Sequence, residues 1–97
     1  MQAVPLPAVR RGRPKGSKPF DAPTAIAIGC ALRVARIGQG IAQEQLALIA
    51  GLERSFVGQI ERGENQPSFG ILLRLAHALE CSGAELVAQA ETFLSVK

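Results

Sequence analysis

Apolar and small residues recur at helical spacing from Asp21 or Thr24 onward, whereas the residues before them show no such period. The first periodic segment ends at Gly38 and Gly40, because glycines at this point commonly stop a helix. The residues that show this helical spacing are Ile28, Leu32, Ala35 and Arg36. The pattern predicts a first helix between these limits.

The next two periodic segments are short, and a glycine separates them. They are predicted as helices at about 43–50 and 54–62, with Gly51 at the turn between them and Gly63 after the second. The positions expected to face inward are Leu46, Ala47, Ile49 and Ala50 in the first and Val57 and Ile60 in the second. Helices of about eight residues are unstable alone, so both need neighbours to pack against.

Two further helices are predicted after a polar loop at 65–67. The segment 68–80 has an apolar stripe wide enough for a central packing helix. The stripe consists of Phe69, Leu72, Leu73, Leu75, Ala76 and Leu79. Ser82 and Glu85 form a capping-box pattern, which predicts a fifth helix that continues to about Phe93.

Length and composition favour one small all-α domain, residues 21–97. The chain has 97 residues, 47% of them hydrophobic, with four Phe and neither Trp nor Tyr. The core must therefore consist mainly of Leu, Ile, Val and Ala, which suits packed helices. A core of this size is modest and often gains stability from a partner chain.

Residues 1–20 differ from the rest in composition and charge. They contain four prolines and two glycines, so we expect a disordered arm that buries no core. They also carry five of the eleven Lys and Arg residues. They contain no acidic residue, because the first one in the chain is Asp21. Such a basic cluster attracts polyanions over about a Debye length.

Several classes of function are disfavoured. No apolar run approaches the ~18 residues of a membrane-spanning helix, and no secretory signal is evident, so we expect a cytoplasmic protein without a membrane partner. Cys30 and Cys81 have no nearby His or acidic partners, which favours reduced core thiols over a metal site. No nucleophile is paired with a base, so we expect neither an enzyme nor a cofactor.

Two stretches resemble a known family. Residues 43–51 read QEQLALIAG, and residues 54–68 read RSFVGQIERGENQPS. They resemble the lambda-repressor-like, or XRE-type, helix-turn-helix family, and the similarity covers about residues 28–86. The resemblance implies a five-helix lambda-repressor-like DNA-binding domain whose helix-turn-helix spans about 43–63. Its second helix would lie in the major groove of double-stranded DNA.

The resemblance also implies base-reading residues, and their chemistry agrees. The expected base contacts are Arg54, Ser55 and Gln59, on the helix face opposite Val57 and Ile60. Arginine bonds two guanine acceptors at once, and glutamine pairs similarly with adenine. The alternative is a solvated polar helix face without base contacts.

Other positions are expected to contact the DNA backbone or support the fold. The expected backbone contacts are Gln43, Phe56, Arg62 and Asn65. Gln43 resembles the family's phosphate-clamping glutamine at a helix N-terminus. Phe56 suits packing against the preceding helix equally well. Arg36 and Glu61 are expected to form a structural ion pair, because an arginine fork fits a carboxylate.

The chain departs from the family pattern at three positions. Ala42 and Glu53 stand where the family usually has a Ser or Thr helix cap. Gly58 lies inside the recognition helix, where glycine costs about 1 kcal/mol relative to alanine. We therefore expect a recognition helix of marginal stability that reads bases with few side chains.

The arm resembles an AT-hook, a short minor-groove-binding motif with a Gly-Arg-Pro core. Glycine lets the backbone enter the narrow groove, proline keeps the chain extended, and arginines seek the negative potential of A·T tracts. The residues expected to take part are Arg10, Arg11, Gly12, Arg13, Pro14, Lys15 and Lys18. An unspecific basic tail is the alternative.

These features favour a sequence-specific transcriptional regulator, expected to act as a repressor and a homodimer on a palindromic operator. The candidate dimer interface is Leu86, Ala90, Phe93 and Leu94, although the same stripe suits packing within one chain equally well. One alternative is an antitoxin that binds a toxin and autoregulates its operon. Another is an architectural protein that binds A·T-rich DNA.

Overall fold

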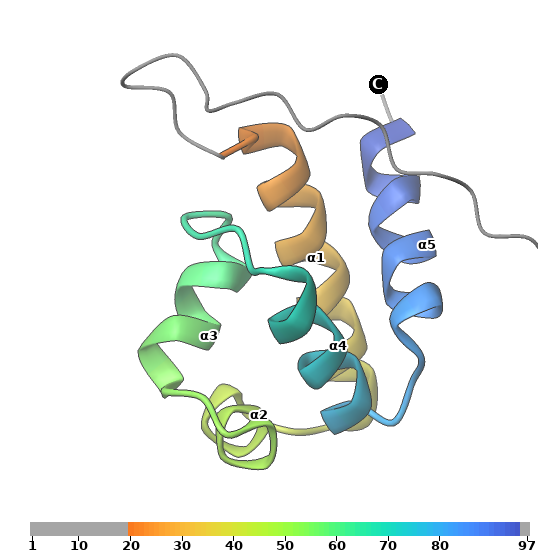
Figure 1. Ribbon diagram of the computed structural model, residues 1–97. Coiled ribbons are helices and arrows are strands. Elements are labelled where there is room, and N and C mark those ends of the chain that lie inside the picture. Colours follow the sequence, from red (N-terminus) through yellow and green to blue (C-terminus); the bar gives the residue numbers. More distant parts are fainter. Residues whose placement is uncertain (1–19, 96–97) are drawn as a thin grey trace, which may run out of the picture.

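The computed structural model describes residues 20–95, and within this range it is all-α. The helices are α1 (Ala22–Gln39), α2 (Gln43–Ala50), α3 (Arg54–Glu61), α4 (Phe69–Ala78) and α5 (Gly83–Ser95). Figure 1 shows α5 lying alongside α1 and running in the opposite direction. The predicted five-helix all-α fold is confirmed. The expected arm contacts at residues 10–18 lie outside the described residues.

Side-chain caps define the first and last helices, and the capping box of the last one was predicted from the sequence. The Asp21 carboxylate accepts a hydrogen bond from the Thr24 backbone N–H at 3.2 Å, and Gly40 ends α1 with a φ of 72°. At the start of α5, Ser82 Oγ accepts from the Glu85 N–H at 3.0 Å, and the Glu85 carboxylate accepts from the Ser82 N–H at 2.8 Å. This reciprocal pair satisfies two N–H groups that a helix start leaves without partners.

Helices α2 and α3 lack such caps, which confirms the departures seen in the sequence. Neither Ala42 nor Glu53 makes a side-chain cap hydrogen bond. The Gln45 side chain accepts from the Ala42 N–H at 3.1 Å, so α2 retains half of a capping box. Gly51 makes the turn between the two helices with a φ of 72°, a left-handed conformation that favours glycine.

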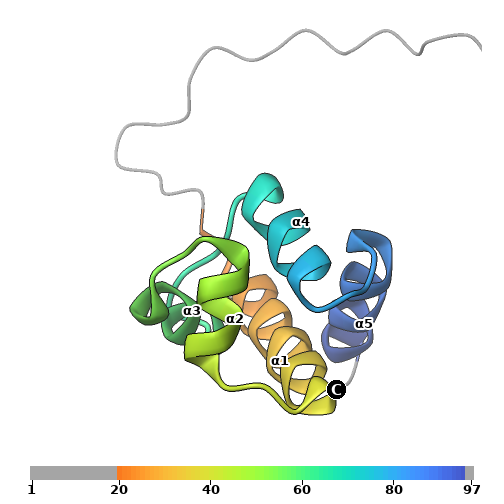
Figure 2. The same cartoon turned by 90° about the horizontal axis from the view of Figure 1, so that it is seen from below.

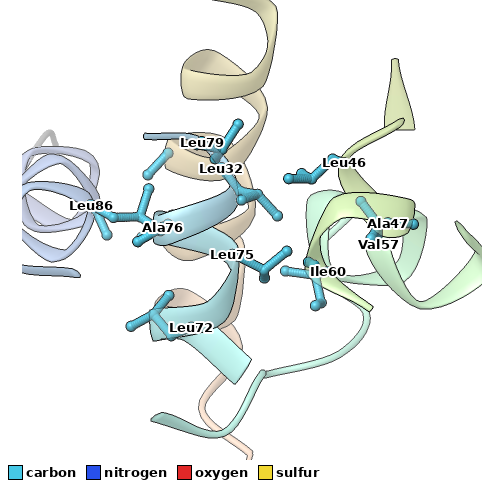
Figure 3. Close-up of a cluster of buried hydrophobic side chains, with 14 residues drawn as sticks. Leu32, Leu46, Ala47, Val57, Ile60, Leu72, Leu75, Ala76, Leu79 and Leu86 are labelled. Atoms are coloured by element: carbon cyan, nitrogen blue, oxygen red, sulfur yellow. The ribbon is translucent and has the colours of Figure 1, made fainter. Parts of the chain in front are cut away.

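A single apolar core joins all five helices. Figure 2 shows α1 between the α2–α3 pair on one side and α4 and α5 on the other. In Figure 3, Leu75 of α4 points toward Ile60 of α3, and Ala76 lies toward Leu86 of α5. Helix α4 contributes buried side chains to both halves of the core, but the central position predicted for it belongs to α1, which lies between the halves and packs against both α3 and α5.

Two residues predicted to face inward are exposed instead. The exposed fraction of Ile49 is 61%, because the buried face of α2 is the narrower set Leu46, Ala47 and Ala50. The exposed fraction of Phe69 is 69%, because it is the first residue of α4 and lies at the edge of the core. Both residues are apolar but lie outside the narrow stripe that each helix buries, so apolar character alone predicted too much burial.

Helix α4 is also shorter than the predicted 68–80. Ser68 is its cap and accepts a hydrogen bond from the Ile71 N–H at 3.2 Å. The last helical residue is Ala78, and Glu80 follows with a left-handed φ of 59°. Helix α3 similarly ends one residue before the predicted Arg62, whereas α5 continues beyond Phe93 to Ser95.

Gly29 lets α1 approach the end of α3 more closely than any other residue would. A Cβ atom built on Gly29 would lie 2.3 Å from the carbonyl oxygen of Ile60 and 2.8 Å from that of Glu61. Both distances are far below van der Waals contact, and both involve backbone atoms. The position of α3 therefore depends on the absence of a side chain at Gly29.

The two cysteines form no disulfide among the described residues. Cys30 and Cys81 are free and half-buried, so they lie at the border of the core rather than inside it.

Among residues 20–95, no single helix has the length and apolar composition to cross a membrane. The bent pair α1 and α2, with a 100° break, meets that criterion only when its two helices are taken together.

Candidate nucleic-acid interface

The three predicted base-reading residues share the outer face of α3. Arg54 and Ser55 are exposed and Gln59 is half-buried, whereas Val57 and Ile60 have exposed fractions of 0%. An open hollow of about 340 Å³ lies at this face. Its lining residues are Gln43, Arg54, Ser55, Gly58, Gln59 and Arg62. The fold thus brings five of the seven predicted contact residues of the helix-turn-helix around one concave polar surface.

Arg36 and Glu61 form the ion pair that the sequence predicts. Arg36 Nε lies 2.6 Å from Glu61 Oε2, and Arg36 Nη2 lies 3.0 Å from Glu61 Oε1. The exposed fractions of the two side chains are 13% and 3%. The hydrogen bonds to Glu61 raise the pKa of Arg36 above its usual value. Because Arg36 also donates to the Ile41 carbonyl at 2.8 Å, the pair joins α1, the following turn and α3.

Gln43 is hydrogen-bonded to the same ion pair, a contact that the sequence pattern did not reveal. Its Nε2 donates a hydrogen bond to Glu61 Oε1 at 3.0 Å. One amide hydrogen is thereby used inside the protein, and the second remains for another acceptor. Glu61 therefore fixes the orientation of the Gln43 side chain at the rim of the hollow.

Arg62 is paired in the free protein. Its Nε and Nη2 donate to the two carboxylate oxygens of Glu64 at 2.9 and 3.1 Å. These hydrogen bonds raise the pKa of Arg62 and lower the pKa of Glu64. Both side chains are more than half exposed, so the pair is screened by solvent. An anion that approached Arg62 would have to compete with Glu64.

Gly58 forms part of the floor of the hollow rather than its outer wall. It is buried, and a Cβ built on it would lie 3.0 Å from Arg62 Nη1 and 3.6 Å from Gln43 Oε1. A side chain at position 58 would therefore meet the ends of these two side chains first. The sequence predicted that Gly58 weakens the helix and leaves few side chains to read bases, and the structure shows that it also leaves space for the ends of Arg62 and Gln43.

The loop after α3 folds back onto that helix and contacts Gln59. Gly63 turns the chain with a φ of 74°, and the Glu64 N–H donates to the Gln59 carbonyl at 2.9 Å. Asn65 Nδ2 then donates to the side-chain oxygen of Gln59 at 3.4 Å. This contact between two predicted DNA-binding residues is invisible in the sequence, because it depends on the loop conformation.

The same loop holds the start of α1. The Asp21 backbone N–H donates to Gln66 Oε1 at 2.8 Å, a contact between residues 45 positions apart. Gly63 packs against Ile26 closely enough that a Cβ on Gly63 would lie 2.8 Å from Ile26 Cγ1. The point where residues 1–20 join the domain therefore lies beside the loop that follows α3.

Phe56 is half-buried and packs against the apolar core. This position agrees with the packing alternative that the sequence left open. The other predicted residues of the interface all lie at or beside the hollow. Phe56 therefore contributes to holding α3 against the rest of the domain.

The predicted dimer stripe on α5 divides into two parts. Leu86 and Ala90 are buried within the domain, with exposed fractions of 2% and 6%, so packing inside one chain is the correct alternative for them. Phe93 and Leu94 remain 38% and 44% exposed. They line an open hollow of about 300 Å³. Its remaining lining residues, which the sequence did not assign to a dimer interface, are Pro23, Ile26, Ala27 and Cys30 of α1.

Comparison with protein families matches a helix-turn-helix family model to residues 32–86, which include the second part of α1, all of α2, α3 and α4, and the start of α5. The chain belongs to this helix-turn-helix family. Membership confirms the lambda-repressor-like resemblance that the sequence of α2 and α3 suggested.

Two curated relatives of the helix-turn-helix chain are regulators. The uncharacterized HTH-type transcriptional regulator y4dL of Sinorhizobium fredii is 43% identical over 49 residues, which are 50% of this chain and 25% of that protein. The control protein C.SmaI of Serratia marcescens is 43% identical over 47 residues, which are 48% of this chain and 56% of that protein. The match thus spans a quarter of one relative and just over half of the other.

Solved structures of regulators share the fold. The restriction-modification controller protein C.AhdI from Aeromonas hydrophila has a TM-score of 0.63 and 42% identity, and the match covers 64% of this chain and 94% of that one. The clp gene regulator ClgR from Corynebacterium glutamicum has a TM-score of 0.72 and 28% identity, with 74% and 77% covered. The helix-turn-helix fold described here is therefore one that named regulators use.

Proposed function

We propose that this protein is a sequence-specific DNA-binding transcription regulator that places α3 in the major groove. The observation that carries the proposal is the polar outer face of α3, where Arg54, Ser55 and Gln59 line one open hollow. Val57 and Ile60 hold this helix against the core, so the polar face is presented on a rigid element. Membership of the helix-turn-helix family and the names of the relatives support the same function.

Phosphate contacts from the rim of the hollow fix the domain on the duplex. Gln43 at the start of α2 keeps one amide hydrogen for a phosphate oxygen, while Glu61 holds the other. Arg62 exchanges Glu64 for a phosphate when DNA binds. Asn65 supplies its second amide hydrogen from the adjacent loop. These contacts position the protein, and the three residues on α3 read the bases.

The basic arm contacts the minor groove next to the one that α3 enters. Its attachment point is held beside the α3 loop by the hydrogen bond between Asp21 and Gln66. The eight Cα-to-Cα steps from Arg13 to Asp21 span at most about 28 Å. The adjacent minor groove lies roughly half a DNA turn away, about 17 Å along the axis. The covalent reach of the arm is therefore sufficient for Arg11 and Arg13 to enter it.

The regulator acts as a homodimer, with a second copy covering the apolar surface of α1 and α5. Phe93 and Leu94 are candidates for this contact because they are exposed beside Ile26, whose exposed fraction is 54%. Phe93→Ser with Leu94→Ser should give a monomer by sedimentation equilibrium. Leu48→Ser removes a still more exposed apolar side chain outside this surface, at 82% exposure, and should leave the dimer intact.

The proposed role is repression in the cytoplasm, in which the protein bound to its operator blocks RNA polymerase. Two of the similar proteins are named as controllers, one of them of restriction-modification. Regulation of a small operon is therefore the first physiological role to test. Co-purification of a toxin from the native host would favour the antitoxin role instead.

Selection of binding sites from random double-stranded DNA tests the proposal. A sequence-specific dimeric regulator should return a palindrome whose half-sites lie about one helical turn apart. Recovery of A·T-rich DNA without a palindrome would instead support an architectural role. Arg54→Ala should weaken binding to the selected site more than binding to random DNA. Arg33→Ala serves as its control, because both arginines are exposed but Arg33 lies on α1 outside the hollow.

A further inference from the structure

The side-chain contact between Asn65 and Gln59 restricts what Gln59 can offer to a base. Asn65 Nδ2 donates to Gln59 Oε1 at 3.4 Å, and both side chains are half-buried. The loop that carries Asn65 is fixed to the backbone of Gln59 by the hydrogen bond from the Glu64 N–H at 2.9 Å. The two amide groups are thus held together by the backbone as well as by their own contact.

A glutamine amide has a carbonyl oxygen at one end and an NH2 group at the other. Bidentate recognition of adenine uses both ends, because N7 accepts a hydrogen bond and N6 donates one. When Asn65 donates to Gln59 Oε1, the carbonyl end is directed toward the loop and the NH2 end is left for the hollow. Gln59 then presents donors to the groove, and guanine is the base that offers two acceptors there, O6 and N7.

We propose that Asn65 is a specificity-determining residue, which orients the Gln59 amide so that it favours guanine over adenine and cytosine. The proposal rests on the proposed function, since it assumes that Gln59 reads a base. Cytosine presents only an amino donor at the major-groove edge and is opposed by the outward NH2 group. Asn65 acts here through Gln59 and is a positioning residue for it.

Two substitutions at position 65 should move the preference in different ways. Asn65→Ala removes the donor, so the Gln59 amide can turn freely and recognise adenine with both ends. Asn65→Asp reverses the contact, because a carboxylate only accepts and will take a hydrogen bond from the Gln59 NH2 group. The Gln59 carbonyl then faces the groove, where it favours the amino groups of adenine and cytosine.

The measurement is binding-site selection with the full chain and with each variant, followed by competition between sites that differ at one base pair. Gln59→Ala identifies that base pair as the one whose preference it abolishes. At this pair the native chain should prefer guanine over adenine by about fivefold or more. Asn65→Ala should reduce the ratio to near one, and Asn65→Asp should invert it. Ratios between sites cancel any uniform loss of affinity that the added charge causes.

The outcomes separate this inference from the proposed function. If Gln59→Ala changes the preference at one base pair but both Asn65 variants keep the native preference, the orienting role of Asn65 is wrong and base reading by Gln59 stands. If Gln59→Ala changes no preference, Gln59 reads no base and the inference fails with that assumption. Thermal melts of all variants verify folding, and Asn65→Ser replaces any variant that does not fold.

Discussion

Alanine at Gly29 should destabilise the protein, because this residue allows the closest backbone approach between α1 and α3. The added Cβ would lie 2.3 and 2.8 Å from two carbonyl oxygens at the end of α3. Neither oxygen is the end of a flexible side chain, so α1 and α3 must move apart. Overpacking of this kind costs about 1–3 kcal/mol and more in severe cases, against a gain of about 1 kcal/mol in helix propensity.

Alanine at Gly38 provides a matched control in the same helix. A Cβ on Gly38 would meet no atom within 4 Å beyond its chain neighbours and the adjacent backbone of α1, so only the propensity gain of about 0.5–1 kcal/mol remains. In a domain of this size, 1 kcal/mol shifts the melting temperature by roughly 4–8 °C. We therefore expect Gly29→Ala to lower the melting temperature by about 10 °C and Gly38→Ala to raise it by about 5 °C, as followed by circular dichroism.

The direction in which Gly29→Ala changes the melting temperature tests whether α1 and α3 cross this closely. If Gly29→Ala melts at or above the temperature of the unsubstituted chain, then the close crossing of α1 and α3 does not exist. A displaced α3 should also weaken DNA binding. Affinity measured well below the melting temperature should therefore fall for Gly29→Ala and stay unchanged for Gly38→Ala.

Four further predictions concern the ion pairs, the weak cap and the arm. Glu61→Gln leaves the Arg36 charge partly buried without its partner and should cost about 3 kcal/mol in urea unfolding, while an unchanged midpoint would show that the pair is not structural. Glu53→Ser supplies the missing cap of α3 and should raise the free energy of unfolding by about 1 kcal/mol; no gain would mean that the backbone N–H groups at the start of α3 already have hydrogen-bond partners. Glu64→Gln frees Arg62 for phosphate and should strengthen binding to any DNA, whereas an affinity that stays the same would exclude Arg62 as a phosphate contact. Deletion of residues 1–18 should flatten the slope of log affinity against log salt by up to ~4 if all five cations contact phosphates, and an identical slope would mean that the arm does not touch DNA.

Hydrophobic spacing was sufficient to predict the five helices and the anchors of α3. Val57 and Ile60, three residues apart, are fully buried as expected. The same reasoning failed for Ile49 and Phe69, because a spacing argument treats every apolar residue near the stripe as buried. Only the neighbouring helices determine how wide the buried stripe is, and these short helices bury narrow ones.

The residues that line the hollow on α3 could be identified from the sequence, but the hydrogen bonds between them could not. The helix-turn-helix pattern identified the residues that line the hollow, and an ion pair between Arg36 and Glu61 followed from the same resemblance. The hydrogen bonds of Gln43 to Glu61 and of Asn65 to Gln59 depend on how a helix and a loop meet in space. No local sequence period records such contacts, so they required the structure.

Reading of bases by α3 is the central claim, and the affinity of Arg54→Ala tests it most directly. The variant should lose about five- to 150-fold in affinity for the selected site and far less for a scrambled duplex of the same composition and length. Arg33→Ala, an exposed arginine outside the hollow, should change the ratio of the two affinities little. An equal loss on both duplexes for Arg54→Ala would contradict base reading at the start of α3 and leave Arg54 as a phosphate contact.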